Sequence, residues 1–141
     1  MKLFKSKLAN RLAIAKTIGF VFGLLGFFLM PVVFNETDLM LRFAFLAWYT
    51  TFGVIIGLFG IMKKHPVINM PTPFWFRGIF MGAWLNFVLA LFMYDRLVLL
   101  IQGTTWEGMS PFWIILEGLV IGLIIDYFAT KFGGEGKELL K

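Results

Sequence analysis

Four long apolar stretches, separated by short polar connections, dominate the pattern of hydrophobic and polar positions along the chain. Each stretch is long enough to cross a bilayer as a helix, which takes about 20 residues. The third could continue to Ile101, leaving the bilayer or bending along its surface near Asp95. The pattern therefore predicts an all-α polytopic membrane protein, a single domain over residues 1–141 with spans at about Ala13–Phe34, Leu39–Met62, Pro73–Tyr94 and Pro111–Ala129.

Three of the predicted helices have recognisable start signals. Thr72-Pro73 precedes the third span and Ser110-Pro111 the fourth, so a hydroxyl group is available to cap free backbone amides. Proline at the first helical position costs nothing, because its missing N–H would have no partner there. Asp38 is the candidate cap of the second span.

Composition supports the assignment to a membrane and excludes several kinds of chemistry. The 141 residues are 60% hydrophobic and 15% charged, whereas a soluble domain has about 45–50% apolar and 25% charged residues. The absence of cysteine excludes disulfides and thiolate sites, and a single histidine, His65, excludes a multi-histidine metal site within one chain. We therefore expect no cofactor, no metal and no enzymatic activity.

The basic residues predict the orientation. The net charge of +5 does not indicate a nucleic-acid partner, because the basic residues lie beside apolar segments rather than on one face. By the positive-inside rule both termini are expected in the cytoplasm of a bacterium, with the chain in the cytoplasmic (inner) membrane. The tail "GGEGKELLK" is expected to be flexible and solvated. The basic residues on this side are Lys2, Lys5, Lys7, Arg11 and Lys16 in the N-terminal tail, Lys63 and Lys64 in the second connection, and Lys131, Lys137 and Lys141 in the C-terminal tail.

Every predicted helix contains two glycines four residues apart, the GxxxG spacing. This spacing favours close approach of helix backbones in lipid, where small residues line helix interfaces. On a rise of about 1.5 Å per residue, the third and fourth spans match in antiparallel register, with Gly82 opposite Gly122, Asn86 opposite Gly118 and Asp126 opposite Gly78. In the first two spans Gly19 is expected opposite Gly57 and Gly23 opposite Gly53. The pattern predicts two antiparallel hairpins in a compact bundle, packed through Gly19, Gly23, Gly53, Gly57, Gly78, Gly82, Gly118 and Gly122.

Four polar residues within the spans are the candidate intramembrane site: Arg77, Asn86, Glu117 and Asp126. An ionisable side chain at the bilayer centre costs at least about 2.5–3.5 kcal/mol, so such residues pair, face the interior or line a pathway. Arg77 and Asp126 have similar depth. Either they pair with each other, or each side chain extends its charged end to the nearest water boundary. The alternative to these structural roles is a function in transport or in binding of lipid headgroups. Asn86 is expected to join helices by hydrogen bonds.

Glu117 is the strongest functional candidate among the four. It lies next to the glycine stripe, turned by about 100° from Gly118, and both it and Asn86 are expected near mid-membrane. A carboxyl group in hydrocarbon is expected to keep its proton, and it could carry that proton, hold a cation or bond to a partner helix. Glu117 and Asp126 are nine residues apart and project from opposite sides of their helix. Glu117 must therefore face the first helix, the second helix or a second copy.

These features favour a non-enzymatic accessory or assembly subunit that packs through glycine-lined helix faces. The alternative is a minimal homodimeric transporter or channel that uses Glu117 and Asn86. A lipid-modifying enzyme is third, because His65 and the few hydroxyl groups form no recognisable catalytic constellation. The expected partners are the lipid bilayer and either a second copy or a larger membrane complex.

Overall fold

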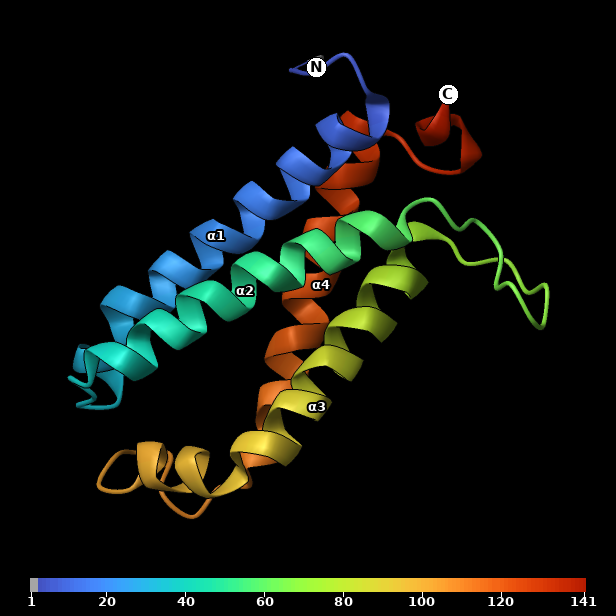
Figure 1. Cartoon of the computed structure of the whole chain (residues 1–141). Helices are drawn as coiled ribbons and strands as arrows, with labels where there is room; N and C mark the ends of the chain where they lie inside the picture. The colour runs from blue at the N-terminus through green and yellow to red at the C-terminus, as the bar shows by residue number, and fades with distance from the viewer. Residues whose placement is uncertain (1–2) are drawn as a thin grey trace.

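The computed structural model describes residues 3–141 and is helical, with no strand among these residues. Its four long helices are each long and apolar enough to cross a membrane, which confirms the predicted all-α integral membrane protein. Of the basic N-terminal residues, Lys2 lies outside the described range. The elements, shown in Figure 1, are α1 (Lys7–Val33), α2 (Leu39–Phe59), α3 (Phe74–Ile101), η1 (Pro111–Trp113), α4 (Ile114–Gly133) and η2 (Lys137–Leu140).

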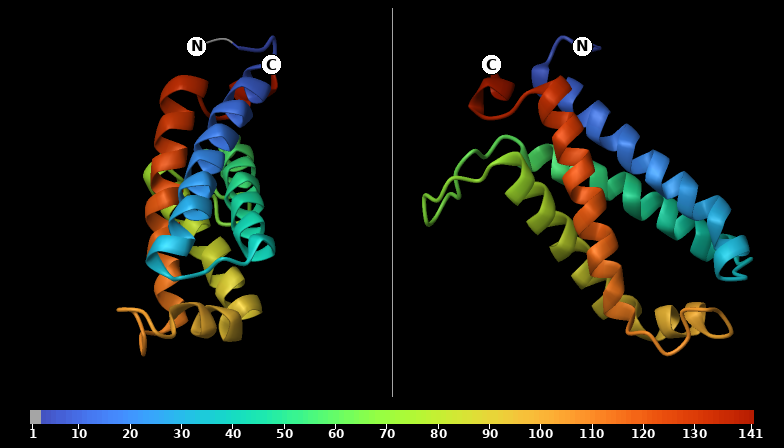
Figure 2. Two further views of the ribbon diagram at one scale, coloured as in Figure 1. Left: turned by 90° about the vertical axis from the view of Figure 1, so that its left-hand side faces the viewer. Right: turned by 180° about the vertical axis from the view of Figure 1, so that it is seen from behind.

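The helices form two antiparallel hairpins, α1 with α2 and α3 with α4, as the sequence predicts (Figure 1). The hairpins pack against each other mainly through α1 and α4. They converge at the end where both chain termini lie and diverge toward the other end (Figure 2). We call the first the termini end, which also holds the connection 60–73, and the second the opposite end, which holds the connections 34–38 and 102–110.

The first helix begins earlier than the apolar pattern predicts, at Lys7 rather than Ala13. Ser6 caps it, because the Oγ atom of Ser6 accepts a hydrogen bond of 3.3 Å from the backbone N–H of Ala9. Arg11 therefore lies inside α1, where its side chain is fully buried. The prediction that Arg11 belongs to an N-terminal tail before the first helix was wrong.

The other helix starts follow the expected caps with one exception. Asp38 accepts from the backbone N–H of Met40 at 3.0 Å, and Ser110 accepts from that of Phe112 at 3.2 Å and opens η1. Thr72 does not cap α3. Its hydroxyl group instead donates to the carbonyl oxygen of Met62 at 2.8 Å, which closes the connection between the hairpins.

The third helix bends at Met93, whose backbone angles are φ −114° and ψ 18°. The segment beyond the bend turns across the opposite end toward the connection between α1 and α2 (Figure 1). Arg96 in this segment forms an ion pair of 2.8 Å with Glu36. The chain thus bends close to Asp95, where the sequence predicts it to leave the bilayer or follow its surface.

The C-terminal tail is ordered against the bundle, so the expectation of a flexible, solvated tail was wrong. The backbone N–H of Gly136 donates to the carbonyl oxygen of Gly60 at 2.7 Å. Leu139 in η2 is 2% exposed. Burial of one leucine and a backbone hydrogen bond to the end of α2 give the tail a fixed position.

The seam between α3 and α4 has the register that the glycine spacing predicts. A Cβ atom added to Gly122 would lie 2.8 Å from the Cα atom of Gly82, and one added to Gly118 would lie 2.7 Å from the Cβ atom of Asn86. Because real Cβ atoms almost never come closer than 3.0 Å to such atoms, only glycine fits at these crossings.

The seam between α1 and α2 is offset from the predicted register by about one helical turn. Gly19 lies against Tyr49 and Gly53, rather than Gly57, and Gly23 lies against Leu46 rather than Gly53. Ala15 supplies the small residue that faces both Gly53 and Gly57. This register also brings Arg11 to the end of α2.

Candidate functional site

A buried carboxylate on α4 is the centre of a charge cluster at the termini end. Asp126 is fully buried, and both of its oxygens accept hydrogen bonds from arginines. Arg77 of α3 donates from Nε to Oδ2 at 2.8 Å and from Nη2 to Oδ1 at 3.0 Å. Arg11 of α1 donates from Nη2 to the same Oδ1 at 2.5 Å. One aspartate therefore joins three helices.

The other two guanidinium nitrogens of Arg11 also have hydrogen-bond partners. Its Nε atom donates to the carbonyl oxygen of Gly57 on α2 at 2.8 Å. Its Nη1 atom donates to the carbonyl oxygen of Gly134 at 2.7 Å and to the hydroxyl oxygen of Thr130 at 3.0 Å. Arg11 thus adds α2 and the start of the tail to the cluster.

Arg77 extends the cluster to the connection and the tail. Its Nη1 atom donates to the carbonyl oxygen of Thr72 at 3.1 Å, and its Nη2 atom donates to Glu135 at 2.9 Å. Two arginines are then balanced by Asp126 and Glu135. Among the described residues no buried side-chain nitrogen or oxygen lacks a partner, the condition under which buried charges are tolerated. The cluster therefore holds the helices and the tail together. Arg77 and Asp126 were predicted from the sequence, whereas Arg11 and Glu135 were not.

The sequence does contain a signal for the position of Arg11. Arg11, Ala15, Gly19 and Gly23 are spaced four residues apart, so they share one helix face. The same spacing places Gly122 and Asp126 on one face of α4. Extending the small-residue stripe of α1 toward its N-terminus would have placed Arg11 in the bundle.

Asn86 lies in a second polar group, between the two hairpins, and is fully buried. Its Oδ1 atom accepts from the indole N–H of Trp48 at 3.1 Å. Its Nδ2 atom donates to the carbonyl oxygen of Ile114 at 2.8 Å and to the hydroxyl oxygen of Tyr49 at 3.2 Å. Asn86 therefore joins α2, α3 and α4, and Trp48 and Tyr49 are partners that the sequence analysis did not identify.

Glu117 is joined to this group through Tyr49, whose hydroxyl group donates to Oε1 of Glu117 at 2.8 Å. It lies in the first turn of α4. Unlike Asn86 and Tyr49, Glu117 is exposed on the surface of the bundle. It faces the second helix and does not meet Asp126, as its position nine residues away requires.

The arrangement around Glu117 can hold a hydrogen-bond donor or a cation at the surface of a span. Tyr49 satisfies one side of the carboxyl group and fixes its position. The described residues contain no group of three or more metal-ligating side chains.

Comparison of the chain with protein-family models, with curated proteins and with solved structures finds no match. A functional interpretation consequently depends on the geometry of the charge cluster and of Glu117.

Proposed function

We propose that the chain is a non-enzymatic accessory or assembly subunit of a larger membrane complex, and that its partner binds the α4 surface around Glu117. The observation that carries the proposal is the exposure of this carboxyl group on a membrane-spanning helix. Asp126 and Asn86, by contrast, are buried and fully bonded. An exposed ionisable group in lipid is costly and is stabilised by a complementary group from outside the chain.

The glycine-lined faces are not the contact surface in this proposal. They are occupied inside the two hairpins, where a Cβ atom at Gly78 or Gly118 would collide with the backbone of the neighbouring helix. The surface around Glu117 consists instead of exposed apolar side chains at the end of η1 and on the same side of α4. These are Trp113, Leu116 and Val120.

Charge complementarity indicates the nature of the partner. A carboxyl group in lipid favours a helix that presents a basic or hydrogen-bond-donating side chain at the same depth. A second copy whose two-fold axis passes close to Glu117 would place this residue against an identical carboxyl group. We therefore expect a different membrane protein rather than a homodimer.

The test is thiol cross-linking in native membranes, which the cysteine-free chain allows directly. Leu116→Cys and Val120→Cys should give one cross-linked product whose mass differs from that of a dimer. Val21→Cys on the exposed side of α1 is the control and should give none. Adding Glu117→Leu should abolish the product. Equal products at all three positions, or a dimer at α4, would overturn the proposal.

A minimal transporter is the second candidate, because Glu117, Tyr49 and Asn86 form a continuous hydrogen-bonded chain from the surface to the interior. Asn86→Cys and Glu117→Cys, labelled with a membrane-impermeant thiol reagent, separate the two functions. Labelling at both positions means that water reaches the interior and favours transport. The absence of labelling at Asn86→Cys, together with the cross-link at α4, favours the accessory-subunit function.

The proposed orientation places the termini end in the cytoplasm of a bacterial inner membrane. It is supported by the gathering of Lys5, Lys7, Lys63, Lys64 and Lys131 at that end. Asp38→Cys and Lys64→Cys should label from opposite sides, with Lys64→Cys accessible from the cytoplasm. Labelling of both from one side would contradict this topology.

A further inference from the structure

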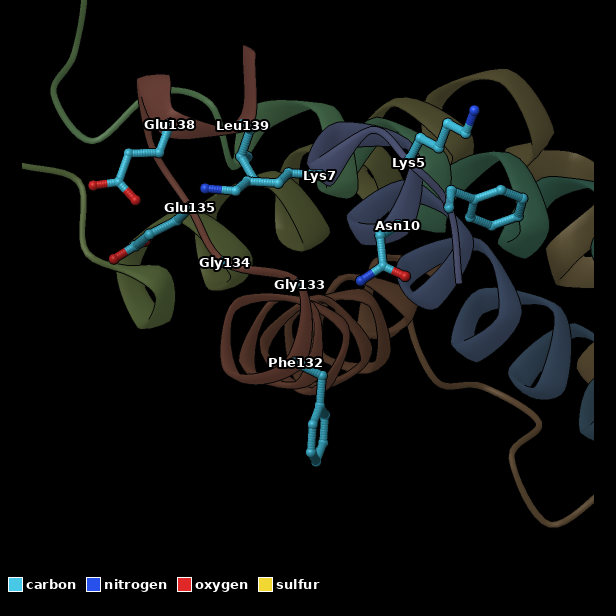
Figure 3. Close-up of a pocket in the computed structure, with 10 residues that line it drawn as sticks. Lys5, Lys7, Asn10, Phe132, Gly133, Gly134, Glu135, Glu138 and Leu139 are labelled. Atoms are coloured by element: carbon cyan, nitrogen blue, oxygen red, sulfur yellow. The ribbon is translucent and has the colours of Figure 1, made fainter. Parts of the chain in front are cut away.

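A cavity of about 270 Å³ lies at the termini end, between the start of α1 and the C-terminal tail (Figure 3). Asn10, which is 5% exposed, lines it, and its Oδ1 atom accepts from the backbone N–H of Leu3 at 2.9 Å. This bond holds the segment before α1 beside the cavity. On the other side, Leu139 fixes the tail.

Charged residues of both signs surround this cavity: Lys5, Lys7, Glu135 and Glu138. Within residues 3–141, Lys5, Lys7 and Glu138 form no ion pair, and Glu135 pairs with Arg77 behind it. In Figure 3 the Lys7 side chain extends toward the side that carries Glu135 and Glu138, whereas Lys5 lies on the other side. Two lysines and two glutamates favour a ligand that is itself charged at both ends.

Size and position restrict that ligand further. Sites for drug-sized molecules occupy about 300–1,000 Å³, so this cavity suits a small polar group. It lies where α1 begins and α4 ends, the level at which a membrane-spanning bundle meets lipid headgroups. Phe4 and Phe132 on its lining are about half exposed and offer an apolar surface beside the charges.

We propose that this cavity binds the headgroup of a zwitterionic phospholipid that carries a phosphate and a primary ammonium group, as in phosphatidylethanolamine. Lys5, which lies on the side away from the two glutamates, binds the phosphate, and Glu135 and Glu138 accept hydrogen bonds from the ammonium group. Phe4 and Phe132 contact the glycerol backbone and the first acyl carbons. A quaternary ammonium group has no N–H to donate, so a choline headgroup should bind less well.

The experiment is native mass spectrometry of the full chain in detergent, titrated with phosphatidylethanolamine, phosphatidylcholine or phosphatidylglycerol. We expect phosphatidylethanolamine to bind at least about fivefold more tightly than the other two, the ratio given by one partly screened charged contact. Lys5→Gln should weaken its binding by about the same factor. Glu138→Gln should reduce the preference over phosphatidylcholine, with Glu135 remaining as a charged acceptor. Lys64→Gln and Glu107→Gln, which remove the same charges away from the cavity, should change nothing.

Soluble phosphoethanolamine separates a membrane lipid from a free phosphoester as the ligand. Competition by phosphoethanolamine at millimolar concentration would mean that the headgroup alone is recognised. Competition only by the intact lipid would mean that the aromatic contacts are required as well. Equal binding of the three lipids by the unmodified chain, or tighter binding of phosphatidylglycerol, would overturn the proposal without any variant.

Discussion

Arg77 binds Asp126 through two hydrogen bonds, with Nε 2.8 Å from Oδ2 and Nη2 3.0 Å from Oδ1. This bidentate geometry is the strongest form of an arginine–carboxylate contact. Arg11 binds the same carboxylate from the other hairpin. Asp126 and the two arginines therefore join the two hairpins at the end where they converge.

Replacing Asp126 by asparagine should strongly destabilise the bundle. The substitution keeps the shape of the side chain but leaves Arg11 and Arg77 buried with Glu135 as their only counter-charge. Breaking a buried ion pair by removal of one partner costs about 3–5 kcal/mol. The free energy of unfolding, measured by denaturant titration in mixed micelles, should fall by this amount.

Asp95→Asn is the matched control for this substitution. Asp95 is exposed and lies beyond the bend in α3, so its substitution should change the free energy of unfolding by no more than about 0.5 kcal/mol. If the two variants were equally stable, the cluster would not hold the hairpins together.

Gly82→Ala should destabilise the packing of α3 against α4. A Cβ atom at this position would overlap the carbonyl oxygen of Gly118, which belongs to the backbone and cannot rotate away. Overpacking of a close contact costs about 1–3 kcal/mol, and the same unfolding titration should show this loss.

Gly26→Ala provides a test with the same chemical change and no collision. A Cβ atom at Gly26 meets nothing within 4 Å, and alanine is favoured over glycine in a helix by about 0.5–1 kcal/mol. Gly26→Ala should therefore be neutral or slightly stabilising. A similar loss in the free energy of unfolding for both variants would show that close packing at Gly82 is not what makes glycine necessary there.

Much of the architecture can be predicted from the sequence because its signals are local. The length of an apolar stretch predicts a span, and glycines at i and i+4 predict a close crossing, so the α3–α4 seam follows directly. The same register places Arg77 and Asp126 at similar depth, and their pairing is one of the two alternatives that the sequence leaves open. The burial of Arg11 does not follow, because a basic residue near the start of a span also fits a cytoplasmic tail. Its position depends on how α1 is aligned with α2.

The partners of Asn86 and Glu117 depend on distances that one helix cannot specify. Tyr49 and Trp48 are ordinary aromatic residues of an apolar helix in the sequence, and only the packing of the two hairpins brings them to Asn86. The ordered tail likewise depends on a single buried residue, Leu139, within a segment rich in glycine and charge. Composition alone therefore favoured disorder there.

Asn86 and Tyr49 should be energetically coupled. Their direct hydrogen bond of 3.2 Å joins α3 to α2, and Asn86 also donates to the carbonyl oxygen of Ile114 on α4. Interhelical hydrogen bonds in membranes contribute about 0.6–1.7 kcal/mol, so Asn86→Ala and Tyr49→Phe should each destabilise the bundle by an amount of this order. A double-mutant cycle should give a coupling energy above about 0.5 kcal/mol.

The control cycle pairs Asn86→Ala with Thr17→Val. Thr17 donates to the carbonyl oxygen of Ala13 in its own helix at 2.7 Å and has no contact with the second polar group. These two changes should add to within about 0.3–0.5 kcal/mol. An equally additive result for Asn86 with Tyr49 would contradict the proposed network.

Leu139→Ala should release the C-terminal tail while leaving the four spans folded. A buried leucine truncated to alanine loses about 2–5 kcal/mol, and even 2 kcal/mol raises the fraction of open tails about 30-fold. Trypsin cleavage after Lys137 should accelerate accordingly, because proteolysis of a rapidly opening segment follows the open population. Leu140, its neighbour, is 62% exposed. Leu140→Ala should therefore leave the cleavage rate unchanged, and equal acceleration by both variants would mean that the tail is not held by the burial of Leu139.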